Sequence, residues 1–338
     1  MPRALVTGGT GFLGTHIANA LTGAGHEVRV LDVNPPGALA APGQEFVAGD
    51  VRDAEVVRRA AEGCDVVVDN AALVPVTRVS AAEYRSVNVG GCRATLRAAR
   101  AAGAYVVHIS SSAIYGVPRE LPVTSTTPLD PFEPYGASKA EAERVVAEER
   151  ERGLPVASLR PRTLLGPGRL GIFDVIFARV RAGRRVPLFG GGDNVVQMAD
   201  VEDFCAAVLA AIERRAEGDY NVGAARYGTA REDIGALIAH AGTGARVQPI
   251  PVWAIRAVLQ PLALAGRSPF TVWHWRSAPS SFYFDLSDTI AALGWEPRHS
   301  NAQALARAYD DYLARPALGD SAHRRPLRGV LARALRGS

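Results

Sequence analysis

The sequence predicts an α/β fold: a doubly wound parallel sheet with helices on both faces. Two observations lead to this prediction. Short apolar runs alternate with longer helical stretches through about the first 160 residues, which is the pattern of repeated strand–helix–strand units. A glycine-rich turn follows the first apolar run, and such sheets bind ligands beyond the carboxyl ends of their strands. From about residue 166 the alternation breaks down, so we expect a smaller second domain.

The expected strands are the short apolar runs, because parallel strands are covered on both faces. They lie at 3–7, 27–32, 64–69, 104–110 and 155–160, with a weaker run at 45–48. The helical stretches lie between them, near 12–24, 53–62, 81–102 and 133–152.

The composition is that of an ordinary globular protein, since 48% of the 338 residues are hydrophobic and 21% are charged. The net charge of +4 mostly reflects arginines after residue 314, so we expect no nucleic-acid partner. The three cysteines are far apart, which offers neither a disulfide framework nor a metal site. The first strand leaves no room for a signal peptide, and no apolar run approaches ~18 residues. We therefore expect a cytoplasmic protein without membrane contact.

The first strand leads into the glycine-rich turn and then into a helix. Gly8, Gly11 and Gly14 stand three residues apart, and glycine there lets N–H groups at the helix start approach a pyrophosphate. The turn is therefore predicted to bind a dinucleotide. The second strand ends at Asp32, where a carboxylate accepts hydrogen bonds from an adenosine ribose and repels a 2′-phosphate. No arginine directly follows it, which favours NAD over NADP; a loop-capping aspartate is the alternative.

Further candidate cofactor residues follow the next two strands. Asp50 and Val51 come after the third strand, where we expect contact with an edge of the cofactor's adenine. The fourth strand is followed by small residues that let a cofactor lie close to the backbone, namely Asn70, Ala71 and Ala72.

Three later polar features are less specific. Asn88 is a polar residue in an apolar helical stretch, and a buried amide bonded to backbone and a functional residue are equally good interpretations. His108 alternates with apolar residues inside the fifth strand, which favours a core histidine over a catalyst. Ser110, Ser111 and Ser112 follow that strand and suit a substrate oxygen, although serine also simply ends strands.

The stretch Tyr135-Gly-Ala-Ser-Lys139 contains the only lysine among 38 lysine and arginine residues. A buried site that must hold one compact positive charge against a phenol favours an ammonium over the planar guanidinium of arginine. In a helix, Tyr135 and Lys139 lie at i and i+4 on one face, where the cation stabilises a phenolate. The stretch therefore predicts a tyrosine acid–base catalyst; a surface tyrosine–lysine contact is the alternative.

Taken together, these residues resemble the extended short-chain dehydrogenase/reductase family, which includes sugar-nucleotide epimerases and dehydratases. The matching segments are TGGTGFLG at 7–14, Asp32, Gly49-Asp50-Val51, Asn70-Ala71-Ala72, Asn88, SSSAIYG at 110–116, YGASK at 135–139 and the turn from Leu159 to Gly168. We accordingly expect an NAD-binding Rossmann domain at 1–165 to which 195–223 return, a mostly substrate-binding domain at 166–314, and a basic tail at 315–338.

Carried over to this sequence, the resemblance implies that Tyr135 is the catalytic acid/base, with Ser111 as the catalytic hydroxyl. Lys139 is then the partner of the tyrosine and also holds the nicotinamide ribose. The residues implied to bind NAD are Gly8, Gly11, Phe12, Leu13, Gly14, Asp32, Asp50, Val51, Asn70, Ala71, Ala72, Asn88, Tyr135, Lys139 and Pro161.

Departures from the family narrow the chemistry. Its dehydratases carry an Asp-Glu pair just after the catalytic hydroxyl residue, and related decarboxylases have a glutamate there; this chain has Ser112-Ala113. With no carboxylate at this place, elimination is disfavoured, and reversible oxidation of a carbinol carbon by NAD remains. Epimerases usually have an asparagine where this chain has Thr163. They also have a diphosphate-binding arginine near the place of Asp193, and an aspartate there would repel a diphosphate.

Three other arginines, Arg162, Arg169 and Arg276, are able to replace the missing diphosphate-binding arginine, because each can pair with phosphate oxygens. Each is also plausible as a surface arginine. The substrate-binding residues are thus expected to be Ser112, Thr163, Arg162, Arg169, Gln197 and Arg276.

We predict an NAD-dependent epimerase of a nucleotide sugar, which works by transient oxidation to a ketone and forms a homodimer. The alternative is an NAD(P)-dependent dehydrogenase or reductase of an apolar alcohol or ketone, similar to the 3β-hydroxysteroid branch. Thr163, Asp193 and a tryptophan-rich lid within 225–280 favour this alternative. A module that only senses the cofactor is disfavoured, because Tyr135, Lys139 and Ser111 are all present. For the tail at 315–338, a solvated segment is favoured over a helix on anionic lipid or on a partner subunit.

Overall fold

The computed structural model describes residues 1–75, 79–168, 172–254, 257 and 279–314. These residues form two compact units. The first unit contains Met1–Leu165, Gln197–Tyr227 and Phe282–Ala304, and the second contains the described residues of 166–196, 228–281 and 305–314. Segment Phe282–Ala304 thus belongs with the sheet, whereas the sequence placed 166–314 mostly in a substrate-binding domain.

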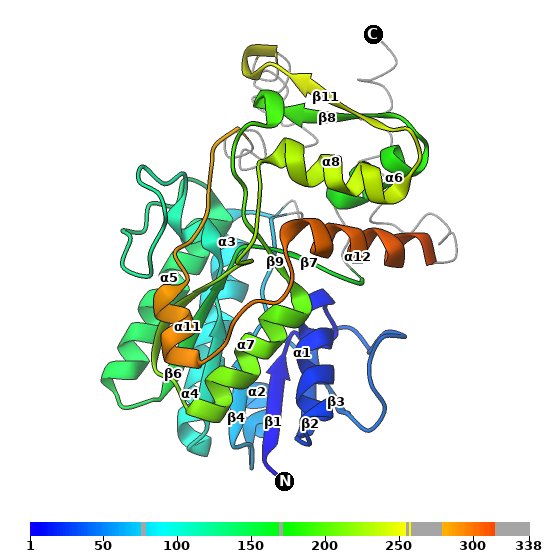
Figure 1. Ribbon diagram of the computed structural model, residues 1–338. Helices are drawn as coiled ribbons and strands as arrows, with labels where there is room; N and C mark the ends of the chain where they lie inside the picture. The colour runs from blue at the N-terminus through cyan, green and yellow to red at the C-terminus, as the bar shows by residue number, and fades with distance from the viewer. Residues whose placement is uncertain (76–78, 169–171, 255–256, 258–278, 315–338) are drawn as a thin grey trace. The chain divides into compact units, whose positions relative to one another are not determined.

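The first unit is built on a seven-stranded sheet (Figure 1) in the order β10-β6-β5-β4-β1-β2-β3, and every neighbouring pair is parallel. The strand order turns at β1, which is the place where doubly wound sheets bind ligands. The predicted fold class is confirmed. The strands are β1 (Arg3–Thr7), β2 (Glu27–Asp32), β3 (Glu45–Ala48), β4 (Val66–Asp69), β5 (Tyr105–Ile109), β6 (Val156–Pro161) and β10 (Gly218–Val222).

Helices cover both faces of this sheet, and each face has its own apolar core. On one face, α1 (Phe12–Gly23) and α7 (Val201–Arg214) bury residues such as Leu21 and Phe204. On the other face, the helices are α2 (Ala54–Ala61), α4 (Cys92–Ala102) and α5 (Pro134–Glu151). The inner strands β1, β4, β5 and β6 contain continuous buried runs, as expected for parallel strands between two helix layers, whereas the edge strand β3 contains no buried residue.

The predicted helix over 81–102 is three consecutive segments. A short α3 (Ala81–Tyr84) is followed by the π-helical segment η1 (Arg85–Gly91) and then by α4. A π-helical turn inside a helix is uncommon and is frequent at functional sites. Further short elements of the first unit are η2 (Ser112–Tyr115), β7 (Thr163–Leu165), which pairs with β9 (Met198–Asp200), and α11 (Ser287–Leu293).

The second unit contains a two-stranded parallel sheet of β8 (Arg185–Phe189) and β11 (Arg246–Ile250). Its other elements are α6 (Ile172–Arg181), η3 (Gly190–Gly192) and α8 (Ala230–Ala241). Helix α12 (Asn301–Ala314) begins in the first unit and continues in the second. There Tyr309 packs against Phe177, with ring centroids 5.6 Å apart.

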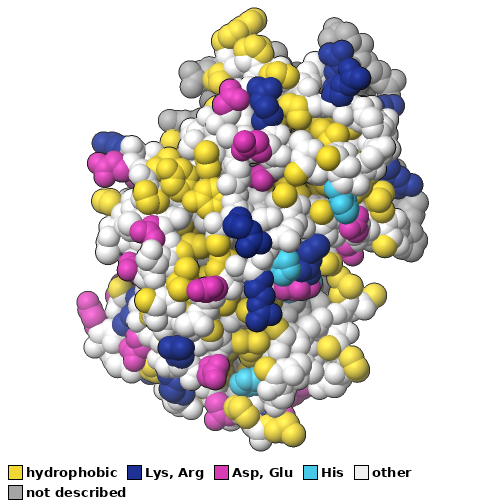
Figure 2. Space-filling view, in the orientation of Figure 1, with side chains coloured by type: hydrophobic (Ala, Val, Ile, Leu, Met, Phe, Trp, Pro, Cys, Tyr) yellow, Lys and Arg dark blue, Asp and Glu magenta, His cyan; other side chains and the backbone are white. Residues whose placement is uncertain are grey.

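Surface charge is mixed in sign over the face drawn in Figure 2, where basic and acidic side chains are interspersed. In the described part of the chain, no helix combines the length and the apolarity needed to cross a membrane.

Candidate active site

The turn between β1 and α1 is packed too closely for side chains at two of its glycines. A Cβ on Gly14 would lie 2.1 Å from Gly8 O, and a Cβ on Gly8 would lie 2.7 Å from Ala71 Cα. Gly8 also has a φ of +63°, which glycine adopts without strain. Gly11 caps α1 without a side-chain hydrogen bond, so no side chain at the cap competes for the N–H groups of the first turn, where Phe12 and Leu13 lie. Such a helix start fits a pyrophosphate.

Asn70 ties this turn to the end of β4. Its Nδ2 donates to Thr7 O at 3.3 Å and to Gly8 O at 3.1 Å. The backbone N–H groups of Asn70 and Ala71 both donate to Thr7 Oγ1, at 3.1 Å and 3.2 Å. The side chain of Asn70 therefore shapes the glycine turn, and Ala71, followed by Ala72, brings the backbone of the loop against it.

The two predicted carboxylates near the adenosine have different surroundings. Asp32 ends β2 and accepts hydrogen bonds from Thr10 N at 3.2 Å and Asn34 N at 3.0 Å, so it also fixes the glycine turn, as a loop-capping aspartate does. Asp50 is paired with Arg52, whose side-chain hydrogen bond lowers the pKa of Asp50. Val51 is 6% exposed, so only its backbone remains for an adenine edge.

The start of helix α5 lies against the η2 turn that follows β5. Glu133 caps the helix by accepting hydrogen bonds from the N–H groups of Gly136 and Tyr135, and Pro134 takes the first helical position. A Cβ on Gly136 would lie 2.6 Å from Ala113 O, so the helix and the η2 turn are in backbone contact. Tyr135 is 8% exposed and lies in that first turn.

Lys139 is buried one turn further along α5, with 4% of its surface exposed. Its Nζ donates a 2.6 Å hydrogen bond to Ile109 O, at the carboxyl end of β5. Burial lowers the pKa of Lys139, while the negative charges of Asp69 and Glu143 oppose that shift. The structure thus places the lone lysine in the interior and not in a surface contact.

The serines after β5 differ in their partners. Ser111 caps η2, and its Oγ accepts a 3.2 Å hydrogen bond from Ala113 N, which leaves the hydroxyl hydrogen available to another acceptor. Ser112 is buried, and its Oγ accepts a 3.0 Å hydrogen bond from Arg162 Nη1. The cation is thus bonded to Ser112, the residue that follows Ser111 in the sequence, and not to Ser111 itself.

Arg162 is a buried guanidinium without a carboxylate partner among the described residues. It is 5% exposed, and its Nε donates to Gln197 O at 3.1 Å. The guanidinium carbon lies 3.9 Å from the centre of the Phe282 ring. Burial alone lowers the pKa of Arg162 to about 9. In the described part of the chain, Arg162 is thus bonded to Gln197 O and Ser112 Oγ and faces an aromatic ring, but it pairs with no carboxylate.

Asn88 lies in the π-helical segment and is 2% exposed. Its Oδ1 accepts from Leu73 N, and its Nδ2 donates to Leu73 O and to Ser138 Oγ. These contacts favour the first interpretation of Asn88, a buried amide bonded largely to backbone, and they place it against the helix that carries Tyr135.

Comparison with known proteins identifies the family. The model of the NAD dependent epimerase/dehydratase family matches residues 4–223. The chain belongs to this family. It is 38% identical to the uncharacterized protein y4nG of Sinorhizobium fredii, over 97% of this chain and 84% of that protein. It is 28% identical to a UDP-glucose 4-epimerase of Lactobacillus helveticus, over 93% and 98% of the two chains.

A solved structure agrees with this membership. The dTDP-glucose 4,6-dehydratase DesIV from Streptomyces venezuelae, solved with NAD and TYD bound, is similar with a TM-score of 0.75 and 29% identity. The match covers 92% of this chain and 97% of that chain. The predictions of the family, of an enzyme and of NAD as cofactor are confirmed. The glycine cradle and the carboxylate at the end of β2 fit that cofactor.

Two residues that bear on the predicted substrate site, Gln197 and Asp193, are bonded to other protein groups. Gln197 is fully buried, and its amide is used at both ends: Nε2 donates to Ala224 O at 2.7 Å, and Oε1 accepts from Phe284 N at 2.8 Å. Both ends of the Gln197 amide are therefore engaged by backbone, and these contacts disfavour its predicted role in substrate binding. Asp193, expected to repel a diphosphate, is exposed and pairs with Arg231 at 3.4 Å within the second unit.

Other predicted positions remain predictions. Pro161 ends β6 and Thr163 begins β7, which brings both to the same turn as Arg162. Arg169, Arg276 and the basic tail at 315–338 lie outside the described residues.

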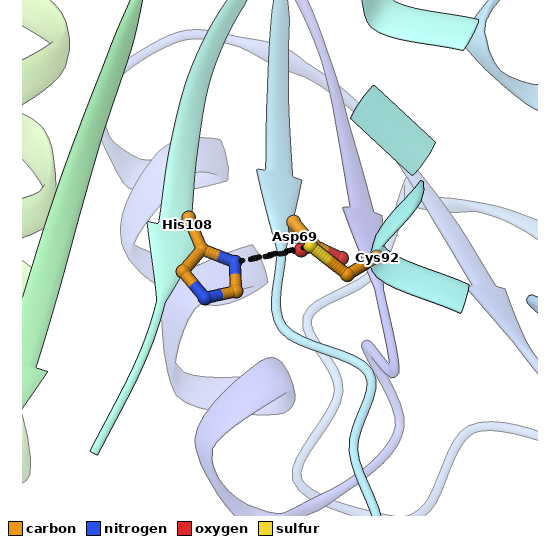
Figure 3. Close-up of side chains that lie close together, drawn as sticks. All are labelled: Asp69, Cys92 and His108. Carbon is orange, nitrogen blue, oxygen red and sulfur yellow. Dashed lines mark hydrogen bonds and ion pairs between the residues drawn. The ribbon is translucent and has the colours of Figure 1, made fainter. Parts of the chain in front are cut away.

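Sequence reasoning missed a buried polar network beneath the site. Glu143 and Arg160 form a buried ion pair at 2.8 Å, and Arg160 also pairs with Asp219 at 2.6 Å. His108 was interpreted as a core histidine without a named partner; its Nδ1 lies 2.7 Å from Asp69 Oδ2 (Figure 3). The sequence did contain a signal for this pair, because Asp69 and His108 are each the polar residue of an otherwise apolar strand.

Proposed function

We propose that this protein is a nucleotide-sugar epimerase that oxidises a carbinol carbon to a ketone and then reduces it on the opposite face. One observation carries the proposal: Tyr135 and Lys139 are buried together, one turn apart, on a helix in backbone contact with the turn that presents Ser111. This is the arrangement needed for a tyrosine that exchanges a proton with a substrate hydroxyl.

Each side chain has a separate role in the proposed reaction. NAD, held by the glycine turn and Asp32, would supply the hydride acceptor for the oxidation and the hydride donor for the reduction. Tyr135 takes the hydroxyl proton during oxidation and gives it back during reduction. The Lys139 ammonium, fixed at Ile109 O, favours the phenolate form of the tyrosine. The free hydroxyl hydrogen of Ser111 binds the substrate oxygen and holds it toward the tyrosine.

Arg162 supports an anionic substrate over an apolar alcohol. Its Nε and Nη1 are bonded to protein, whereas Nη2 donates to no group in the described part of the chain. An apolar alcohol would leave this buried charge without an anionic partner, with the Phe282 ring as its nearest compensation. A phosphate or carboxylate of a nucleotide sugar would pair with it. Because Asp193 pairs with Arg231, its charge no longer argues against such a substrate.

The absence of carboxylates after Ser111 supports epimerisation over dehydration. Ser112 and Ala113 are both buried in η2, and neither can protonate or deprotonate a sugar carbon. Homologues at this identity include both epimerases and dehydratases, so the preference for epimerisation rests on this feature of the chain itself.

The test follows the cofactor and the sugar separately. The purified protein is incubated with UDP- and dTDP-hexoses, NADH is followed by absorbance, and the sugar configuration is followed by proton NMR. We expect a change of configuration without net accumulation of NADH. Stoichiometric NADH from an apolar alcohol, with no sugar nucleotide converted, would instead establish the dehydrogenase alternative.

The Tyr135→Phe variant assigns the acid–base role. We expect it to retain NAD affinity and to lose turnover, because only the phenolic oxygen is removed. Unchanged turnover would exclude Tyr135 from the mechanism. The homodimer, which is part of the same proposal, is tested by light scattering of the purified protein.

A further inference from the structure

Tyr84, the last residue of α3, lies beside the proposed catalytic tyrosine. The centroids of the Tyr84 and Tyr135 rings are 6.1 Å apart, and the ring planes are inclined at 63°. This edge-to-face arrangement is a favourable geometry for two aromatic rings in contact. Tyr84 is 5% exposed and Tyr135 is 8% exposed. Because α3 packs on α5 (Figure 1), the ring of Tyr84 borders the ring of Tyr135 from a neighbouring helix.

The hydroxyl of Tyr84 reaches the loop after β4, where it donates a 3.3 Å hydrogen bond to Val74 O. The same loop carries Asn70, whose Nδ2 donates to Gly8 O, and Ala71, whose backbone lies against Gly8. One side chain therefore contacts the proposed catalytic ring and also holds the loop that borders the glycine turn.

Asn88, four residues after Tyr84, makes a parallel connection between the same two segments. Its amide bonds to the backbone of Leu73 and donates to Ser138 Oγ on α5. Asn88 thus holds the start of α5, whereas Tyr84 contacts the ring of Tyr135. The direction of the phenolic oxygen depends on rotation about the side-chain bonds of Tyr135. Of these two connections, only the one made by Tyr84 acts on the part of Tyr135 that rotates.

Tyr84 is itself a phenol, so it is a candidate for proton transfer in its own right. Two observations disfavour this role. Burial raises the pKa of Tyr84 to about 12, and the charge of Glu133 acts in the same direction. The hydroxyl is also directed to Val74 O. Tyr84 therefore stays protonated at neutral pH, and its contact with Tyr135 is better explained as support for the ring.

We propose that Tyr84 is a positioning residue for Tyr135. Its ring restrains the rotation of the Tyr135 side chain, and its hydroxyl anchors that restraint to the loop after β4. A phenolic oxygen held in one direction meets the substrate hydroxyl in a reactive geometry, and a displacement of about 1 Å is enough to slow a reaction strongly. The effect on turnover rests on the function proposed above, whereas the restraint on the ring does not.

Nuclear magnetic resonance measures the restraint without any substrate. The full-length protein is produced with tyrosine labelled with carbon-13 at Cζ; the chain contains nine tyrosines, and the Tyr135 signal is the one that Tyr135→Phe removes. We expect this signal to be narrow in the unaltered protein. In Tyr84→Leu we expect it to shift and broaden, because the ring then samples more than one rotamer. Tyr84→Phe keeps the neighbouring ring and is expected to retain the narrow signal.

Tyr227→Leu is the matched control. Tyr227 packs against Tyr283 with ring centroids 5.7 Å apart, so the same exchange removes a tyrosine from a different ring pair, and we expect the Tyr135 signal to be unchanged. A folded Tyr84→Leu protein with an unchanged Tyr135 signal would overturn the proposal. So would the absence of a nuclear Overhauser effect between the ring protons of Tyr84 and Tyr135 in the unaltered protein, a measurement that needs no variant.

Turnover supplies the second readout. Tyr84→Leu is expected to lower kcat about tenfold or more, with little change in KM for the nucleotide sugar, and Tyr84→Phe is expected to restore kcat to within about twofold because the ring is present again. A raised KM with unchanged kcat, or an equal loss of kcat in both variants, would contradict the role of the ring. If the Tyr135 signal changes as expected but the unaltered protein converts no sugar nucleotide, the restraint stands and the proposed function fails.

Discussion

The side-chain amide of Asn88 donates a 2.9 Å hydrogen bond to Ser138 Oγ, and Ser138 donates in turn to Tyr135 O at 2.7 Å. Asn88 also holds both the N–H and the carbonyl of Leu73, at 2.8 Å and 3.2 Å. One buried amide thus joins the loop after β4 to the first turn of the helix that carries the proposed catalytic tyrosine.

We expect Asn88→Ala to lower the free energy of unfolding by roughly 2–4 kcal/mol, since it leaves the buried polar groups of Leu73 unpaired. Urea denaturation with an unchanged m value measures this loss. Ser138→Ala, which removes one of the three bonds of Asn88, is the control and is expected to cost only about 1 kcal/mol. Equal losses in the two variants would show that the Leu73 contacts contribute little.

The glycine turn makes a prediction that separates folding from cofactor binding. Gly14→Ala is expected to destabilise the protein strongly, because the new Cβ would lie 2.1 Å from Gly8 O and 2.6 Å from Gly9 Cα. Gly11→Ala is expected to fold normally, because Gly11 has a φ of −69° and its Cβ would meet only Gly8 O, at 3.4 Å.

If the helix start holds a pyrophosphate, Gly11→Ala nevertheless weakens the binding of NAD, because the added methyl group stands where the cofactor approaches the backbone. We expect at least a tenfold loss of NAD affinity by calorimetry, with thermal stability in the absence of cofactor nearly unchanged. Normal NAD affinity in Gly11→Ala would place the pyrophosphate elsewhere.

Features that depend on spacing along the chain were predictable from the sequence. The parallel sheet follows from the order of the apolar runs, and the juxtaposition of Tyr135 and Lys139 follows from a separation of one helical turn. The pairing of Asp69 with His108 depends instead on the register of β4 against β5, which the sequence of either strand does not specify.

The hydrogen-bond partners of buried polar side chains could also not be predicted from the sequence. Arg162 and Gln197 were both expected in the substrate site, but the amide of Gln197 is used by the backbone of Ala224 and Phe284. Only packing decides which buried polar group lacks a partner, because any of several backbone groups from distant segments can supply one.

Glu143 and Arg160 give the protein a specific sensitivity to acid. Burial would raise the pKa of Glu143, but the hydrogen bond and charge of Arg160 lower it to about 2. A carboxyl whose pKa is lower in the folded state than in the unfolded state, where it is about 4.3, contributes stability above that pH. The contribution is lost as the pH falls from about 4.3 toward about 2.

We therefore expect Glu143→Gln to lower the free energy of unfolding by roughly 3 kcal/mol near neutral pH, and this difference to shrink below about pH 4. Urea denaturation at several pH values measures it. Glu141→Gln on the same helix is the control, because Glu141 and its partner Arg85 are both exposed; we expect a change within about 0.5 kcal/mol. A Glu143→Gln difference that is independent of pH would show that the carboxyl is not ionised in the folded protein.

The strongest test of the site is a substitution that preserves charge. Lys139→Arg retains a cation on α5 but replaces a compact ammonium by a planar, longer group with five N–H donors. Among the described residues, the Lys139 ammonium donates to one acceptor, Ile109 O at 2.6 Å, and Lys139 is only 4% exposed. We expect turnover of the nucleotide sugar to fall by roughly 10²-fold or more, because the guanidinium cannot occupy the same place beside Tyr135.

Arg144→Lys, the reverse exchange at an exposed position of the same helix, is expected to leave turnover unchanged. Full activity in Lys139→Arg would mean that any buried cation suffices, and the presence of a single lysine in an arginine-rich chain would then have no catalytic explanation.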